Sequence, residues 1–440
     1  MQSRALIFLL ALALLSPAAA AQEARRLTLR EAIETGLKNN LGVLVAGTQV
    51  DEAGGARQRR LAALLPVARG ESYASLQNRN LRAFGIDFPG APATVGPFSN
   101  YDFRVAFEQP LLDLRSYHRW QASQLQEQAA RHSFQDIRDL IIRQVAALYL
   151  NAQAATARVD ASASRVATAE ALYNLARQQR DAGVATGVDV LRAQVSLANE
   201  QQRLLEARNR RQQALLTLGR AIGLDLAVPL ELAEPLEFKP VETPAILSAL
   251  DSALARRADF LALQSQQQAV GEEEKANRGR FLPRISVGGN YGALGRTLDD
   301  VKATGAIQGT VSINLFDWDR QGERTELESR RRRLAHQLAD LRQGIEEEIR
   351  DALLVLESAA QEVAVAEQGL SLARRELDLS RDRFEAGVTN NIEVVSAQES
   401  LSRAMENRIV ALTRHTDAKT ALARALGATE ENYAHYLGIR

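Results

Sequence analysis

The chain of 440 residues contains no cysteine, and only 5% of its residues are aromatic. The lack of cysteine excludes disulfides, a thiol nucleophile, a cysteine metal site and a lipid anchor on an N-terminal cysteine. The five histidines stand at positions 118, 132, 336, 415 and 435, and no two have the spacing of a zinc site. We therefore expect no metal site and no bound cofactor.

Neither sign of charge is in excess, because 54 Lys and Arg residues balance 54 Asp and Glu residues. A protein whose main partner is nucleic acid needs a basic excess to bind phosphates, so we expect no nucleic-acid partner. The chain also lacks the motifs H-E-x-x-H, G-x-S-x-G and G-x-G-x-x-G and the P-loop. We therefore expect no catalytic residues and no enzyme activity.

The N-terminus carries an apolar run that is too short to span a bilayer. Arg4 precedes the run from Ala5 to Leu15, and small residues follow at Ala18–Ala21. This order is typical of a secretory signal peptide, whereas a membrane-spanning helix takes ~20 apolar residues. We predict that residues 1–21 are a signal peptide cleaved near Ala21, and that the mature protein is exported.

Proline is missing from two long stretches of the chain, between positions 111 and 228 and after position 283. An interior proline breaks a helix, so these stretches can hold long helices. The first, from Asp113 to Ala182, lacks glycine as well and is rich in the helix formers Ala, Leu, Gln, Arg and Glu. A helix of roughly 65 residues would be ~100 Å long. We predict two long helical hairpins, with tips near Gly183 and Gly387.

The sequence contains an internal duplication. Residues 181–197 align without a gap on residues 385–401, an offset of 204 (385 − 181). Leu65-Pro66 matches Leu282-Pro283 at an offset of 217 (282 − 65). One architectural unit is therefore used twice. Apolar residues at coiled-coil spacing predict the packing seams of the hairpins: Val159, Val166, Tyr173, Val188, Leu191 and Val195 in the first copy, and Leu370, Leu377, Phe384, Ile392 and Val395 in the second.

Between the long helices, apolar and polar residues alternate, which predicts β-strands. The alternation is clearest in Tyr101–Glu108, where Tyr, Phe, Val and Phe take every second position. The expected strands span about 67–77, 100–109, 284–294 and 305–315, which makes one β-hairpin in each copy. We expect residues 78–100 to form a long outer loop.

These strands fit either an ordinary half-buried sheet or a membrane β-barrel with a polar lumen. Export without a transmembrane helix favours the barrel. Four strands cannot close a barrel, because the smallest membrane barrels have 8 and an open edge in lipid leaves backbone groups unpaired. Three copies would supply twelve strands. Tyr117, Trp120, Phe316 and Trp318 follow the strand ends, where we expect an aromatic belt at the membrane interface.

Several local sequences, in this order, resemble the outer membrane efflux protein family of TolC-like export channels. They are the opening segment Leu29–Asn40, the helix-to-strand switches Leu64–Pro66 and Phe281–Pro283, the strand exits Gln109–Asp113 and Asn314–Asp317, and the tip sequences Arg383–Gly387 and Glu393–Gln398. The resemblance extends over nearly the whole mature chain.

The resemblance implies a mainly α fold with a small β part, in which a β-hairpin and a very long antiparallel helical hairpin occur twice. It implies a homotrimeric tube, with a 12-stranded β-barrel in outer-membrane lipid and an α-helical barrel in the periplasm. The expected segments are the signal peptide (1–21), a first repeat (22–223), a linker in an equatorial belt (224–245), a second repeat (246–428) and a C-terminal tail (429–440).

The implied function is passive export of solutes, in a tripartite efflux or type I secretion system with a periplasmic adaptor and an inner-membrane pump. A gate at the periplasmic aperture would contain Glu393, with Ser396 at the family's second acidic position. Adaptor docking would fall on the helix tips, at Arg180, Gly183, Val184, Gly187, Arg383, Gly387 and Val388. An alternative role for Glu393 is only to stabilise the start of a helix by its negative charge, and an alternative role for the glycines is only to form the turns.

An alternative function is a periplasmic coiled-coil adaptor or scaffold without a pore. Such proteins usually have one hairpin and a small β domain. The duplication and the four alternating strands argue against this alternative. The sequence leaves the transported substrate open, whether a drug, a metal ion or a polypeptide.

Overall fold

A computed structural model of the chain describes residues 25–85, 89–90, 92–241, 246–389, 391–427, 429–430 and 433–434. The predicted signal peptide lies outside these residues, as does most of the predicted C-terminal tail. The chain divides into two compact units, and each takes residues from both copies of the repeat. The first unit comprises residues up to Ala46, Phe134–Ala258 and Arg342 onward, and the second comprises Gly47–Ser133 and Asp259–Leu341.

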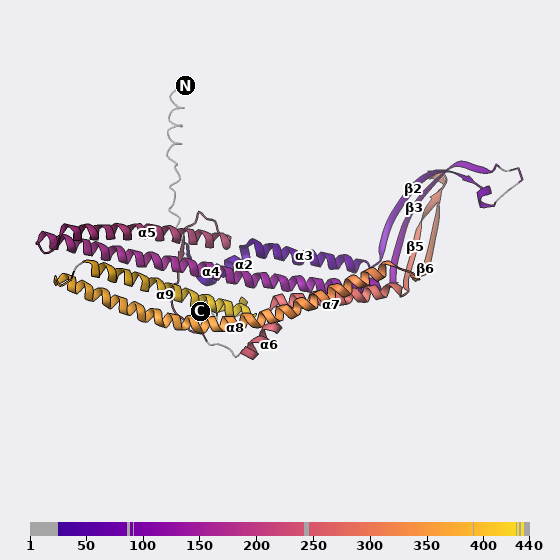
Figure 1. Cartoon of the computed structure of the whole chain (residues 1–440). Coiled ribbons are helices and arrows are strands. Elements are labelled where there is room, and N and C mark those ends of the chain that lie inside the picture. Colours follow the sequence, from indigo (N-terminus) through magenta and orange to yellow (C-terminus); the bar gives the residue numbers. More distant parts are fainter. Residues whose placement is uncertain are drawn as a thin grey trace, which may run out of the picture. The chain divides into compact units, whose positions relative to one another are not determined.

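The elements repeat in the same order in the two copies (Figure 1), and the corresponding helices have nearly the same lengths. In the first copy they are α2 (Leu29–Asn39), α3 (Leu41–Ala62), β2 (Val67–Asn80), β3 (Thr94–Leu112), α4 (Leu114–Asp181) and α5 (Gly187–Ala221). In the second they are α6 (Ile246–Arg256), α7 (Ala258–Arg278), β5 (Arg284–Gly295), β6 (Lys302–Ser312), α8 (Asp319–Glu385) and α9 (Asn391–Ala425). The expected fold, a duplicated β-hairpin and long helical hairpin, is confirmed.

The offset of 217 residues, seen in the sequence only at the Leu-Pro pairs, extends over three elements of each copy. α2 and α6 begin at residues 29 and 246, α3 and α7 at 41 and 258, and β2 and β5 at 67 and 284. The sequence similarity in this part of the duplication is too weak to detect, but the boundaries of the elements keep the offset.

In the described residues of the second unit, four strands form one antiparallel sheet in the order β2-β3-β5-β6 (Figure 1). The register places Arg104 opposite both Glu71 and Gly292, and Phe103 opposite both Ser72 and Ala293. Paired residues point to the same face, so the predicted alternation becomes two distinct faces. The polar face carries Arg69, Glu71, Asp102, Arg104, Glu108, Ser286, Asn290, Gln308 and Thr310, and the apolar face carries Tyr101, Phe103, Val105, Phe107, Val287, Tyr291, Ile307 and Val311.

The first hairpin differs from its prediction. Residues 78–100 were expected to form a long loop, but β2 continues to Asn80 and β3 already begins at Thr94. The Gly and Pro residues in this region obscured the alternation, while pairing with the neighbouring strand keeps the backbone extended. The last strand, β6, spans Lys302–Ser312 instead of 305–315.

Ion pairs close the base of the second hairpin. Arg280 is nearly buried, and its guanidinium contacts Asp317 Oδ2 at 2.6 Å and Glu323 Oε2 at 2.6 Å. In the first copy, Asp113 Oδ1 accepts a hydrogen bond of 2.9 Å from Ser116 N at the start of α4. The strand exits predicted at Asp113 and Asp317 therefore both anchor the beginning of a long helix, through different contacts.

The core of the first unit lies where α2 and α3 pack on α4. Its buried residues are Leu27, Leu29, Ala32, Ile33, Val43, Ile141, Ile142, Val145, Ala146, Tyr149, Leu218 and Ile222. The Tyr149 hydroxyl donates to the carbonyl of Leu27 at 3.0 Å, so the buried phenol has a partner. Among the described residues, no helix is both long enough and apolar enough to cross a membrane.

Residues 224–241, here called the strap, connect the two copies within this unit. The strap contains β4 (Leu230–Leu232), which pairs in parallel with β1 (Arg25–Leu27). Gln153 Nε2 on α4 donates to the carbonyl of Glu234 at 2.8 Å, and Lys419 Nζ on α9 donates to the carbonyl of Lys239 at 3.0 Å. Burial lowers the pKa of Lys419 to about 8. The strap is therefore bonded to one long helix of each copy.

The predicted seams are partly wrong. Leu370, Leu377 and Phe384 are buried as expected, but Val188, Leu191, Val195 and Ile392 are more than half exposed. The return helices instead bury Val190 and Ala193 on α5, and Val394 and Ala397 on α9. Apolar residues occur on two faces of these helices, so spacing alone could not select the face that packs within the chain.

A buried carboxylate lies close to the C-terminal end of the described chain. Asp139 on α4 is 4% exposed, and its Oδ1 has no hydrogen-bond partner. Arg138 binds Glu430, and Arg424 Nη2 contacts Asp136 Oδ1 at 2.7 Å. Burial raises the pKa of Asp139 to about 6, against attraction from Arg424.

We expect Asp139→Asn to stabilise the protein at neutral pH. The folded state holds a proton on Asp139 more tightly than the unfolded state, so the wild type loses stability as the pH rises from about 4 to about 6. The full shift corresponds to about 3 kcal/mol, which the amide avoids. Denaturant unfolding of both proteins in detergent at pH 4, 6 and 8 should show a difference that grows with pH.

Asp136→Asn is the matched control, because it removes a carboxylate that contacts Arg424 and should destabilise the fold. An Asp139→Asn protein that is less stable than the wild type at pH 8 would contradict the assignment.

Candidate functional site: the helix tips

Both helical hairpins turn through the same backbone motif. Gly183 and Gly387 have φ values of 78° and 70°, a left-handed conformation that favours glycine. Gly183 N donates to Arg180 O at 2.9 Å, and Gly387 N donates to Phe384 O at 3.0 Å. The backbone amides of the next residues, Val184 and Val388, each donate to the carbonyl one position earlier in the helix, which completes a Schellman motif. The two predicted tips are therefore equivalent turns.

The return helix of the first copy begins with a capping box. Thr186 Oγ1 accepts a hydrogen bond from Asp189 N at 3.4 Å, and Asp189 Oδ2 accepts one from Thr186 N at 3.0 Å. The Thr186 hydroxyl also donates a hydrogen bond of 2.6 Å to Asp189 Oδ2. This bond first, and the bond from Thr186 N second, lower the pKa of Asp189. Arg192 Nη1 lies 3.8 Å from Asp189 Oδ1.

The corresponding acid of the second copy, Glu393, has partners on both sides of the turn. Arg383 Nε on α8 lies 3.3 Å from Glu393 Oε1, and the Thr389 hydroxyl donates to Glu393 Oε2. The side chain remains 39% exposed. Ser396, the other predicted gate residue, is exposed one turn further along α9.

The two tips pack against each other within the first unit. Leu172 on α4 joins Leu377, Phe384, Val394 and Ala397 of the second hairpin in one buried cluster. Gln179 Nε2 on α4 donates to the carbonyl of Phe384 at 3.1 Å. A Cβ built on Gly387 would lie 4.0 Å from Val184 Cγ1.

The structure therefore brings the predicted docking residues of both copies to one end of the unit. Val184 and Val388 are 69% and 70% exposed, although both are apolar. Arg180 contacts Asp181 at 2.6 Å, and Gly187 is the first residue of α5. Gln179 and Phe384 connect the tips, but sequence spacing gave no sign of their hydrogen bond.

An apolar groove of about 430 Å³ lies between α5 and α9 behind the tips. Its apolar lining consists of Val188, Leu191, Val195, Ile392 and Val395, which include the exposed residues that had been predicted as seams. Charged residues line the same groove: Arg192, Glu200, Arg203 and Glu399.

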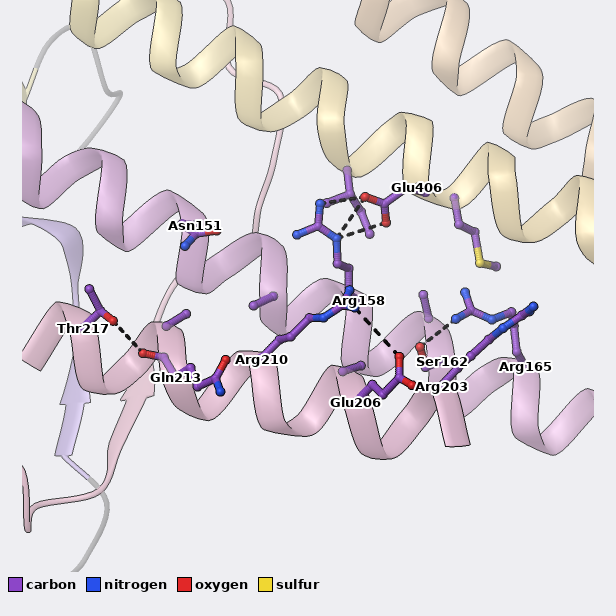
Figure 2. Close-up of a pocket in the computed structure, with 16 residues that line it drawn as sticks. Asn151, Arg158, Ser162, Arg165, Arg203, Glu206, Arg210, Gln213, Thr217 and Glu406 are labelled. Carbon is purple, nitrogen blue, oxygen red and sulfur yellow. Dashed lines mark hydrogen bonds and ion pairs between the residues drawn. The ribbon is translucent and has the colours of Figure 1, made fainter. Parts of the chain in front are cut away.

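A second, polar pocket of about 690 Å³ lies among α4, α5 and α9 (Figure 2). Arg158 extends from α4 to Glu406 on α9, with Nε 3.0 Å from both carboxylate oxygens and Nη2 2.7 Å from Oε1. Figure 2 also shows Arg210 reaching Glu206 along α5, a separation of 3.8 Å. The Arg158–Glu406 pair joins the two hairpins, and no local pattern in the sequence indicates that these two residues meet.

The predicted aromatic residues lie beside the sheet in the second unit. Phe316 and Trp318 follow β6 and are almost fully exposed. Tyr117 and Trp120 lie on the first turns of α4, with ring centroids 5.9 Å apart. Among the residues that the structure describes, no three His, Asp or Glu side chains are arranged to hold a metal ion.

The profile of the outer membrane efflux protein family matches residues 32–224 and 249–428. These two matched segments cover most of the chain and correspond to the two copies of the repeat. The chain therefore belongs to the outer membrane efflux protein family.

Two curated relatives come from Pseudomonas aeruginosa. The alkaline protease secretion protein AprF is 24% identical over 381 residues, which cover 82% of this chain and 76% of AprF. The outer membrane protein OprJ is 26% identical over 346 residues, which cover 75% of this chain and 70% of OprJ.

Solved structures of outer-membrane channels share the fold. The CmeC outer membrane channel of Campylobacter jejuni superposes with a TM-score of 0.80 at 16% identity, covering 93% of this chain and 89% of CmeC. The outer membrane protein VceC of Vibrio cholerae gives a TM-score of 0.78 at 18% identity, covering 91% and 96%.

We expect Phe384→Ala to loosen the tips without unfolding the rest of the chain. The ring is 4% exposed in the cluster that holds both tips, and loss of such a ring costs about 3–5 kcal/mol. Tips open locally, so amide hydrogen exchange near residues 172–179 and 384–397 should speed up. Val388→Ala, at an exposed position of the same turn, should leave exchange unchanged; equal exchange in both variants would contradict the packing role of Phe384.

Proposed function

We propose that the protein is the outer-membrane channel of a tripartite efflux or type I secretion system. Three copies form one tube that conducts solutes passively from a periplasm-spanning pump assembly to the exterior. The protein carries out no chemical reaction. A periplasmic aperture opens and closes through movement of the helix tips.

The observation that carries this proposal is the four-stranded sheet. Within the described residues, β2 and β6 each pair on one side only, so both long edges are open. Phe103, Val105, Phe107, Tyr291, Ile307 and Val311 are exposed on the apolar face. A sheet with a lipid-compatible face and two open edges is stable in a bilayer only when other strands pair with the edges. Pairing of β2 with β6 of the next copy closes a barrel of twelve strands.

The long helices support contact between copies. α5 exposes Val188, Leu191, Val195 and Leu205, and α8 exposes Val365, Leu372 and Leu379 at intervals of seven residues. Such stripes are typical of coiled-coil surfaces that pack on another helix. In the homotrimer, α5 of one copy packs on α8 of the next, which closes a ring of twelve helices.

The partners follow from the family and from the tips. Relatives include a protease secretion protein and proteins of efflux pumps, which leaves both kinds of export system open. The exposed Val184 and Val388, with Arg180, Gly183, Gly187, Arg383 and Gly387, form the surface for a periplasmic adaptor that connects to an inner-membrane pump. Tyr117, Trp120, Phe316 and Trp318 lie beside the sheet and contact the membrane interface.

In this proposal the gate lies at the second-copy tip, and Glu393 and Ser396 face the aperture. For the tips to spread, the two hairpins of each copy must move apart. The Arg158–Glu406 pair and the Gln179–Phe384 hydrogen bond join the hairpins and oppose this movement. They therefore favour the closed aperture.

The test of the proposed function is membrane location, assembly and conduction. We expect the protein in the outer-membrane fraction, as a trimer whose gel migration changes on heating, and we expect the purified trimer to form ion-conducting pores in planar bilayers. A soluble monomer without conductance would overturn the proposal and favour a scaffold without a pore.

We expect Glu406→Gln to shift the gate toward the open state. An ion pair at a partly exposed site contributes about 0.2–1 kcal/mol, and three copies lose it together. Single-channel recordings should show a several-fold rise in open probability. Glu206→Gln, which alters a pair within α5, is the matched control and should not change gating. Equal open probability in the wild type and Glu406→Gln would contradict the role of the pair.

A further inference from the structure

Both return helices carry an acid at the same position of the repeat, and both acids have an arginine partner. Asp189 and Glu393 are separated by the repeat offset of 204 residues. Asp189 lies 3.8 Å from Arg192 and Glu393 lies 3.3 Å from Arg383. A negative charge at the start of a helix is favourable by itself, so helix stability does not require either arginine.

The two arginines do not correspond to each other in the repeat. The offset places Arg192 on Ser396 and Arg383 on Gln179. In the first copy the partner comes from the return helix itself, one turn further along. In the second copy that position is a serine, and the partner comes from the long helix α8, across the turn. A positive charge beside the acid is therefore present in both copies, although its position differs.

The geometry around Glu393 leaves little of its charge uncompensated. Arg383 contacts Oε1, and the Thr389 hydroxyl donates to Oε2. Arg383 is 56% exposed, so its guanidinium faces water beside the carboxylate and is not used in the packing of the tip. The neighbouring charges on α8 and at the first tip, Arg381 with Glu385 and Arg180 with Asp181, are already paired.

We propose that Arg383 determines the ion selectivity of the aperture by neutralising Glu393. The proposal rests on the proposed function, in which three Glu393 side chains converge on the channel axis. Three carboxylates alone would form a ring that concentrates cations and is blocked by multivalent ones. Three guanidinium groups about 3–4 Å from those carboxylates cancel most of that field at the distance of a passing ion. The aperture therefore passes anions and cations with similar ease.

The experiment compares purified trimers in planar bilayers of neutral phosphatidylcholine, with a KCl gradient and with lanthanum chloride added to the periplasmic side. Arg383→Gln should become cation-selective, and lanthanum should block it at a concentration roughly tenfold lower than the wild type, since a change of this size follows from one uncompensated charge per copy. Glu393→Gln should shift selectivity toward anions. The double variant should return to the selectivity of the wild type.

Arg192→Gln is the matched control, because it removes the arginine beside Asp189, the first-copy acid, and should leave selectivity and block unchanged. Heat-sensitive trimer migration checks that all variants assemble. An unchanged Arg383→Gln beside a shifted Glu393→Gln would overturn this proposal and leave the channel function standing. Unchanged selectivity in both variants would show that Glu393 does not lie at the aperture and would overturn the proposal. A wild type without conductance would overturn the channel function itself.

Discussion

The constraint on which the rest of the structure depends is the pairing of backbone hydrogen bonds at the edges of a sheet. Within the part of the chain that the structure describes, β2 and β6 each have one unpaired edge, and β3 and β5 lie between them with an exposed apolar face. In lipid, unpaired backbone groups cost several kcal/mol each, because no water can replace the missing partner. In the proposed membrane channel, a chain with this sheet is therefore incomplete by itself. In the proposed trimer, strands of neighbouring copies pair with these edges, and the exposed stripes on α5 and α8 pack between copies.

The duplication provides a repeated architecture, and the differences between the copies provide the specialised contacts. The turns at Gly183 and Gly387 have the same hydrogen bonds, and α2 and α6 begin 217 residues apart. Polar contacts were not conserved in the same way. Asp113 caps α4 and contacts the half-exposed Arg284 at 3.5 Å, whereas its counterpart Asp317 binds the nearly buried Arg280 at 2.6 Å. A duplicated backbone can keep its hydrogen bonds with any sequence that allows the turn, whereas side-chain pairs can move to other positions as long as each charge keeps a partner.

The long helices, their tips and the alternation of the strands could be predicted from the sequence, because these features depend on local composition. The prediction of the buried helix face was wrong where two faces of a helix are both apolar, as with Val188 and Leu191, since only the neighbouring helix decides which face is buried. The prediction of a loop at residues 78–100 was also wrong at both ends, because pairing between β2 and β3 extends the strands into this region. At the tips, the acid Glu393 was found from its position, but its partner Arg383 depends on the geometry of the turn.

By itself, the sequence determined the elements and their repetition, because the absence of proline, the helix-forming composition and the period-two strands act over a few residues at a time. It also determined that cysteine chemistry plays no part. Only the tertiary structure decided which residues meet across elements: Arg158 with Glu406, Gln179 with Phe384, and the strap with α4 and α9. These contacts join residues far apart in the chain, and their partners are selected by the packing of whole helices, which no local pattern encodes.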